Sequence, residues 1–136
     1  MKLYMLDTDT CSYIIRERPN SVLERFRKLA MEQICISSVT YAELLYGVAR
    51  SSSRRINRPV VDDFVRHLDV IDWDTGAAEQ YGQIRADLEA RGEPVGAMDM
   101  MIAAHAKSIK AVLVTNNQKH FARIKGLKIE NWVQTY

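Results

Sequence analysis

The chain has 136 residues, of which 47% are hydrophobic and 26% are charged. These values are ordinary for a globular protein and argue against a disordered or fibrous chain, so we expect a single domain over residues 1–136. The net charge of +2 permits a nucleic-acid partner without requiring one.

The two cysteines, Cys11 and Cys35, form no CxxC pair and no disulfide framework. This usage favours a reduced, cytoplasmic protein in which both are small core residues. No apolar run is long enough for a transmembrane helix or a secretory signal, so we expect no membrane partner.

The chain opens on the apolar run Leu3–Leu6, which leads directly into Asp7. A short unbroken apolar run is typical of a strand that is buried on both faces. The further expected strands are Ile34–Ser37, Val70–Trp73, Ala111–Thr115 and a weak last strand, Leu127–Trp132.

Apolar residues at helical spacing predict helices between these strands. The expected helices cover 10–16, a segment that starts at Pro19, 39–50 with Ser37 or Ser38 as the cap, a segment that Pro59 opens, 76–91 with Asp74 or Thr75 as the cap, 97–110, and a short turn over 119–124. Alternating strands and helices indicate an α/β fold with a central parallel sheet of about four to five strands, flanked by helices on both faces.

Three acids are placed at strand–helix junctions of this pattern. Asp7 follows the first strand, Glu43 borders the apolar stripe of its helix, and Asp99 lies in the first turn of another helix. Two of them have a structural alternative. The helix dipole favours an acid at the position of Asp99, and Thr40 with Glu43 fits a capping box. Ligands bind at the carboxyl ends of parallel strands, so topology predicts that the three carboxylates converge there.

Crowded carboxylates repel and raise one another's pKa, and a divalent cation removes the conflict. All-oxygen ligands without a His or Cys pair at ligand spacing indicate Mg²⁺ or Mn²⁺ rather than Zn²⁺. Such ions activate water and stabilise the charge that develops in phosphoryl transfer.

Four segments together resemble the successive motifs of the PIN-domain ribonucleases, and among these most closely the VapC toxins of bacterial VapBC toxin–antitoxin pairs. The segments are MLDTDT, ISSVTYAELLYGV, PVGAMDMMIAAHA and AVLVTNNQKHF, and the resemblance extends from Leu3 to about Trp132.

The resemblance implies that Asp7, Glu43 and Asp99 are the catalytic, metal-binding acids of a Mg²⁺- or Mn²⁺-dependent endoribonuclease. Such an enzyme leaves a 5′-phosphate, and its substrate by resemblance is tRNA, in particular initiator tRNA. By cutting RNA such a toxin inhibits translation and growth, and the implied partners are a VapB-like antitoxin and a second copy in a homodimer, within a higher toxin–antitoxin assembly.

The fourth motif departs from the family at Asn117, where many relatives carry an acid. Asn117 offers a carbonyl oxygen but no charge, which places a second tightly held metal in doubt. Asp9 either compensates or serves as a turn residue that opens the helix. Thr115 either orients Asp7 or a ligand water, or is simply a strand residue.

Arg50, Arg54 and Arg55 lie around a serine-rich break and are candidate RNA contacts, although such clusters also form solvated faces. Tyr13, Tyr41 and Trp73 are candidates for base stacking or for the core. His105 is expected to serve helix packing.

Two alternatives stay open at this point. The opening Asp7–Thr10 segment is also similar to the haloacid-dehalogenase-like phosphatases, in which Asp7 would be a nucleophile, but no acidic pair follows Thr115 as that family requires. The other alternative is a non-catalytic RNA-binding module of PIN-like fold, although such a module would not need the three acids.

Overall fold

A computed structural model describes residues 1–133 of the chain and contains a five-stranded, wholly parallel sheet in the order β3-β2-β1-β4-β5. The strands are β1 (Tyr4–Leu6), β2 (Ile34–Ser37), β3 (Asp69–Ile71), β4 (Val112–Val114) and β5 (Ile129–Glu130). The first strand lies in the centre, as its apolar sequence predicts, and Tyr4, Met5 and Leu6 pair with Val112, Leu113 and Val114.

Helices connect successive strands, and a 3-10 turn at Met31–Gln33 precedes β2. They are α1 (Thr8–Ile15), α2 (Asn20–Arg27), α3 (Ser38–Arg50), α4 (Arg54–Arg66), α5 (Thr75–Ala90), α6 (Ala97–Ser108) and α7 (Gln118–Phe121). None of the helices in the described part of the chain combines the length and the apolar composition needed to cross a bilayer.

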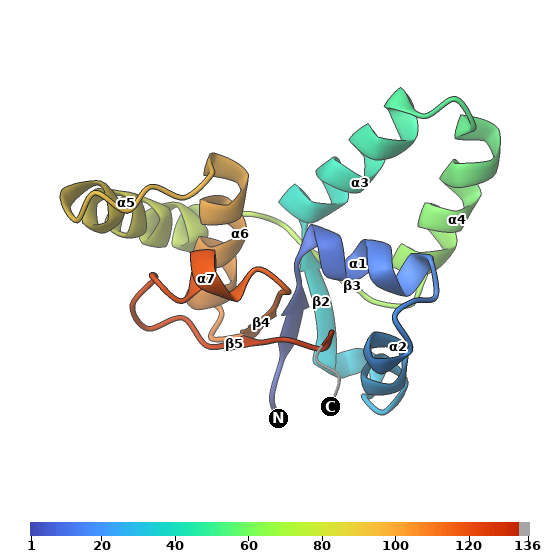
Figure 1. Ribbon diagram of the computed structural model, residues 1–136, viewed down its shortest axis with the longest axis horizontal. Coiled ribbons are helices and arrows are strands. Elements are labelled where there is room, and N and C mark those ends of the chain that lie inside the picture. Colours follow the sequence, from blue (N-terminus) through green and yellow to red (C-terminus); the bar gives the residue numbers. More distant parts are fainter. Residues whose placement is uncertain (134–136) are drawn as a thin grey trace.

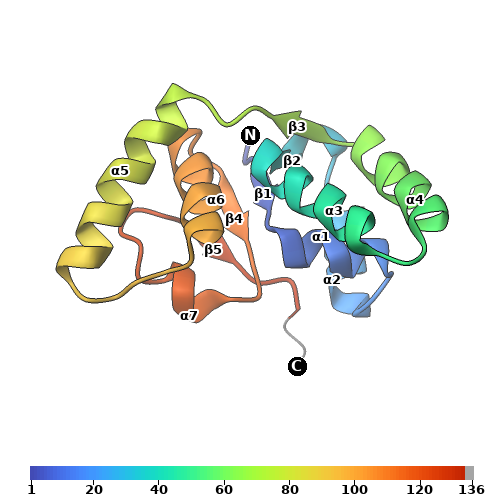
Figure 2. The same ribbon diagram turned by 90° about the horizontal axis from the view of Figure 1, so that it is seen from above.

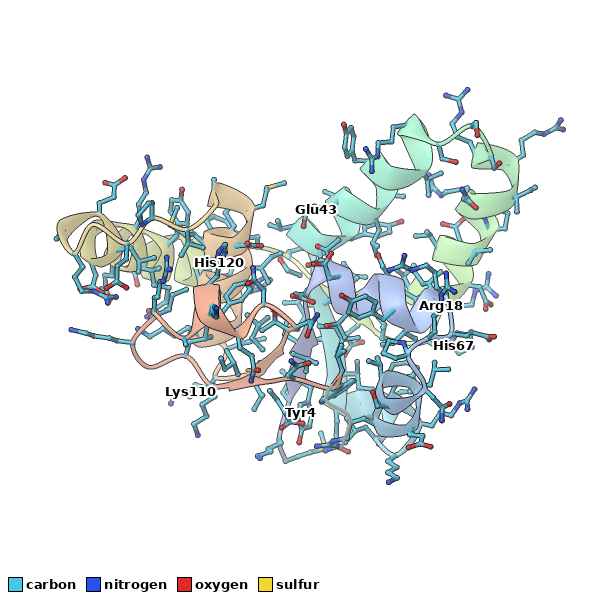
Figure 3. The ribbon with its side chains drawn as sticks, in the orientation of Figure 1. Tyr4, Arg18, Glu43, His67, Lys110 and His120 are labelled. Carbon is cyan, nitrogen blue, oxygen red and sulfur yellow. The ribbon has the colours of Figure 1, made fainter. Side chains whose placement is uncertain are left out.

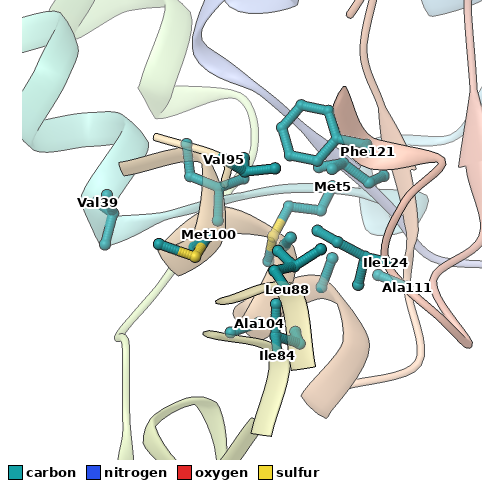
Figure 4. Packing of buried hydrophobic residues seen from close by; sticks show 14 of the residues in the cluster. Met5, Val39, Ile84, Leu88, Val95, Met100, Ala104, Ala111, Phe121 and Ile124 are labelled. Carbon is teal, nitrogen blue, oxygen red and sulfur yellow. The ribbon is translucent and has the colours of Figure 1, made fainter. Parts of the chain in front are cut away.

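Alternate strand residues face opposite sides of the sheet and so build two separate cores. Met5, Cys35 and Leu113 pack beneath α5, α6 and α7. Figure 4 shows Met5 in this core beside Leu88 of α5, Met100 of α6 and Phe121 of α7. Tyr4, Leu6 and Ile36 face the other side, which α1, α2, α3 and α4 cover. Figure 2 shows these two helical layers on either side of the sheet, which confirms the predicted architecture.

The cysteines are core residues, as predicted. Cys11 and Cys35 are buried free thiols, and burial raises the pKa of both, that of Cys35 to about 12. Both thiols are therefore protonated and unreactive at neutral pH.

One predicted helix start is wrong. The helix expected to open at Pro59 begins at Arg54, and Pro59 lies inside it. Ser51 Oγ accepts hydrogen bonds from the Ser53 amide at 2.9 Å and from Asn57 Nδ2 at 2.8 Å, which organises the chain into a helical turn before the proline.

The carboxyl edge of the sheet is where the site is built. There Asp7 follows β1, Ser37 ends β2, and Thr115 follows β4. The beginnings of α1 and α3 meet above this edge, and α6 and α7 lie beside them (Figure 1).

Candidate active site

Asp7 is the buried acid of the site, with 6% of its surface exposed. Its amide donates to the Val114 carbonyl at 3.0 Å, and its Oδ1 accepts from the Thr10 amide at 2.9 Å, so Asp7 is the N-cap of α1. Burial raises the pKa of Asp7; the Asp9 charge adds to the rise, while hydrogen bonding by Thr115 and Thr10 opposes it. The fold therefore holds a carboxylate where ionisation is unfavourable.

Glu43 lies in the second turn of α3, and its Oε1 accepts a hydrogen bond from the Thr8 hydroxyl at the start of α1. The capping box of Thr40 and Glu43 is wrong, because Ser37 caps α3 through a 3.1 Å bond from the Val39 amide to Ser37 Oγ. Thr40 is consequently inside the first turn of the helix, and Glu43 is free to face α1.

Asp99 is half-buried in the first turn of α6. Burial raises the pKa of Asp99, the negative charges of Glu43 and Asp9 raise it further, and His120 opposes the rise. Asp99 therefore lies within electrostatic reach of acids from α3 and α1. His120, on α7, is drawn near Asp99's helix in Figure 3, and no sequence pattern selects it as a site residue.

Asp99 lies within electrostatic reach of Glu43 and Asp9, and Asp7 within reach of Asp9, but the three predicted ligands do not form a closed set. Within residues 1–133, no three Asp, Glu, His or Cys side chains gather at the spacing of ligands to one ion. The carboxylates of Asp7 and Glu43 already accept hydrogen bonds from Thr10 and Thr8. That they share a cation stays a prediction.

The three supporting residues surround the same edge. Thr115 is fully buried, and its hydroxyl accepts a hydrogen bond from the Asn117 amide at 2.9 Å. The Asn117 side chain forms no hydrogen bond with any residue of the described range 1–133, so its amide group is available to a ligand. Asp9 is exposed in the first turn of α1, and Asp7 is the N-cap, so the alternative in which Asp9 is the turn residue that opens the helix is wrong.

A groove of about 460 Å³ leads away from the acids between α1, α3 and α4. Asp9 and Glu43 line one part of it, and Arg50, a predicted RNA contact, lines another. Arg54 and Arg55 are exposed at the start of α4 and are not among the lining residues. Their RNA contact stays a prediction.

The aromatic candidates have structural partners. Trp73 Nε1 donates to the Met101 carbonyl at 2.9 Å, and the Trp73 ring packs edge-on against Tyr81. Tyr13 and Tyr41 pack against the core beneath α1–α4. Sequence reasoning missed Tyr46, which is 66% exposed and lines the groove.

Comparison with known proteins agrees with this architecture. The PIN domain family model matches residues 4–127. The tRNA(fMet)-specific endonuclease VapC of Shigella flexneri is 47% identical over 97% of this chain and 99% of its own.

Solved structures give the same result. The DNA-bound VapBC complex from Salmonella typhimurium contains a chain with a TM-score of 0.91 and 48% identity, covering 97% of this chain and 99% of that one. A VapBC complex from Rickettsia felis, bound to a promoter DNA fragment, gives a TM-score of 0.90 and 41% identity over 96% of this chain and 98% of that one. These matches point away from the haloacid-dehalogenase-like alternative, and the chain belongs to the PIN-domain family, within its VapC ribonucleases.

Proposed function

We propose that this chain is a single PIN domain, residues 1–136, that acts as a Mg²⁺- or Mn²⁺-dependent endoribonuclease and is the toxin of a type II toxin–antitoxin pair. The observation that carries the proposal is the placement of Asp99, which is half-buried in the first turn of α6 and within electrostatic reach of acids on α3 and α1. Its pKa is raised by burial and by Glu43 and Asp9, which come from two other helices. Neighbouring acids disfavour the ionised form of a carboxylate, and a bound cation would offset this repulsion.

Asp7, Glu43 and Asp99 are the residues that would hold the ion. Their donors are carboxylate oxygens, which suit Mg²⁺ and Mn²⁺. When bound, the ion would supply an activated water and stabilise the charge of the scissile phosphate. Thr8 orients the Glu43 carboxylate through their hydrogen bond, and the Asn117 amide is available to orient a water or a phosphate oxygen.

The substrate and partners follow from the relatives. The Shigella relative is named a tRNA(fMet)-specific endonuclease, so initiator tRNA is the proposed substrate class, which entails a cytoplasmic site of action. The solved relatives are VapBC complexes, some bound to DNA, so a VapB-like antitoxin is the proposed partner. We propose a homodimer of this chain within that assembly.

The test is cleavage of initiator tRNA by the purified chain in EDTA, followed by addition of Mg²⁺ or Mn²⁺. The proposal predicts no cleavage in EDTA and recovery with either ion. The Asp99→Asn variant should remain inactive with metal, whereas Glu79→Gln, an exposed acid on α5, should behave as wild type. Full cleavage in verified metal-free buffer would contradict the mechanism.

The same experiment addresses the non-catalytic alternative. An RNA-binding module would bind the tRNA without cutting it in any of the buffers. Binding without cleavage in Mg²⁺ and Mn²⁺ would therefore favour that alternative.

A further inference from the structure

The groove beside the acids joins Glu43, a proposed metal ligand, to side chains of α3 that the proposed chemistry does not use. Glu43, Tyr46, Gly47 and Arg50 all line it. They lie three, four and seven residues apart on α3 and therefore share one face of the helix, over about 10 Å. One continuous surface thus begins at a proposed metal ligand and ends at an arginine.

Tyr46 is unusual among the large side chains of this surface. It is 66% exposed, and the Arg50 guanidinium lies 5.7 Å from the centroid of its ring. An exposed aromatic ring beside a guanidinium is the combination that single-stranded nucleic acids use, with the ring stacking on a base and the cation contacting a phosphate.

The charges along the groove match an anionic strand that reaches the acids. Within residues 1–133, Arg50 and Arg16 form no ion pair with an acid, whereas Arg58 on the neighbouring α4 is paired with Asp62 at 2.9 Å. Arg16 lines the groove from α1, opposite α3. Two unpaired guanidinium groups are therefore available to phosphates that flank the scissile one.

The floor of the groove is open near the middle. Gly47 lies inside α3, where glycine lowers helix stability relative to alanine. A Cβ at this position would meet no atom within 4 Å, so packing against the rest of the fold does not require the glycine. Its lack of a side chain keeps the space beside Tyr46 accessible.

We propose that this groove binds the single-stranded RNA segment next to the cleaved bond, with a nucleobase stacked on Tyr46 and flanking phosphates held by Arg50 and Arg16. The inference deepens the proposed ribonuclease function and rests on it for the identity of the ligand. It assigns substrate positioning to α3 and α1, and it identifies unpaired, splayed nucleotides as the part of the RNA that the enzyme reads.

Binding is measured by fluorescence anisotropy, with a labelled single-stranded oligoribonucleotide and the Asp7→Asn background to prevent cleavage. Tyr46→Leu keeps apolar volume but removes the stacking ring, and should raise the Kd by about 5-fold to 150-fold. Tyr46→Phe should retain the affinity. Ile56→Ala is the matched control, because Ile56 is 70% exposed on the neighbouring α4 but does not line the groove.

Two further measurements separate stacking from a structural effect. A series of oligoribonucleotides carries one abasic nucleotide each, at successive positions of the strand. Only one of these positions should abolish the difference in Kd between Tyr46→Leu and the protein that retains Tyr46. Arg50→Gln should reduce the slope of log Kd against log salt concentration by about 0.7.

Gly47→Leu adds a side chain to the groove without removing a contact, and should block RNA binding while the fold stays intact. Gly82→Leu is its control, since Gly82 is also helical and open but lies on α5. Normal thermal unfolding of both variants would show that the loss of binding is local.

The outcomes distinguish this inference from the proposed function. If wild type cuts RNA in Mg²⁺ but Tyr46→Leu binds as tightly as the control, the groove assignment is wrong and the ribonuclease function stands. If no RNA is cut but binding still depends on Tyr46 and on the abasic position, the groove stands and the function fails. A Tyr46→Leu variant that changes only self-association, seen by sedimentation, or only capture of an antitoxin peptide would assign the groove to a protein partner and overturn the inference.

Discussion

His105 Nδ1 lies 2.7 Å from Ser37 Oγ, and both residues are fully buried. Ser37 is the N-cap of α3, which carries Glu43, and His105 is on α6, which carries Asp99. One hydrogen bond therefore fixes the start of one acid-bearing helix to the body of the other. The expectation that His105 serves helix packing is confirmed.

Removing the Ser37 hydroxyl should destabilise the protein more than an ordinary cap mutation. Ser37→Ala removes the bond to the Val39 amide and leaves His105 Nδ1 buried without a partner, next to Nε2, which already has none among the described residues. The two losses predict a decrease of about 2–4 kcal/mol in the free energy of unfolding. Urea denaturation at neutral pH measures it, with exposed Ser52→Ala as the control. A decrease no larger than that of the control would show that the bond contributes little.

His105 should also make stability depend on pH. Burial lowers the pKa of His105 from 6.5, although Asp74 and Asp72 oppose the shift. Below pH 6.5 the unfolded chain binds a proton at this residue that the folded chain does not bind, so stability falls as the pH decreases from 6.5 toward the folded-state pKa. The slope should reach at most about 1.4 kcal/mol per pH unit.

Denaturant unfolding between pH 5 and 8 checks this effect, because His titrates in that range. His105→Asn keeps a polar group near the position of Nδ1 and should flatten the curve. His67→Gln, at an exposed position, should leave it unchanged. A His105→Asn protein with the wild-type pH dependence would assign the titration to other groups.

The Thr8 hydroxyl should affect metal use rather than folding. It donates to Glu43 and thereby orients a proposed ligand from the neighbouring helix. Loss of such an orienting partner typically lowers metal affinity or activity by about 10–100-fold. Thr8→Val should therefore raise the Mg²⁺ concentration needed for half-maximal RNA cleavage, while Thr8→Ser should restore it. An unchanged Mg²⁺ dependence in Thr8→Val would show that the Thr8 hydroxyl does not orient Glu43 for metal binding.

The order of strands and helices and the place of Asp7 could be predicted because they depend on local pattern. An apolar run that ends in an acid predicts a buried strand with the acid at its carboxyl end, and the structure places Asp7 directly after β1. Ser37 and Ser38 are both candidate caps of α3, since either hydroxyl can bond an amide two or three residues further along the chain. The sheet resolves the choice, because Ser38 Oγ accepts from the Trp73 amide at 3.0 Å instead.

Contacts between distant segments could not be predicted in the same way. Ser37 and His105 are 68 positions apart, and Thr8 and Glu43 are 35 apart, so no sequence window contains either pair. The pair of Tyr46 and Arg50 is local, but its exposure depends on how far α3 projects from the sheet. Whether the three acids hold one ion also depends on side-chain orientation, which topology does not specify.

The most direct test of the account is Asp7→Asn with two readouts, RNA cleavage in Mg²⁺ and thermal unfolding in EDTA. Asn is about as good an N-cap as Asp, so the bond to the Thr10 amide is retained while the charge is lost. The raised pKa of Asp7 means that the protonated acid stabilises the fold below pH 3.8 and that this stability is lost as the pH rises through the folded-state pKa. Asn imitates the protonated form, so stability in EDTA should stay level or rise by about 0.5–2 kcal/mol.

Cleavage by the same variant should fall by orders of magnitude, because a proposed ligand of the ion is lost. Asp74→Asn is the matched control, since Asp74 caps α5 through a 3.1 Å bond from the Ala77 amide and is not one of the proposed ligands. It should cut RNA as wild type does. An Asp7→Asn protein that melts at a lower temperature yet still cuts RNA at the rate of the Asp74→Asn control would contradict the central claim.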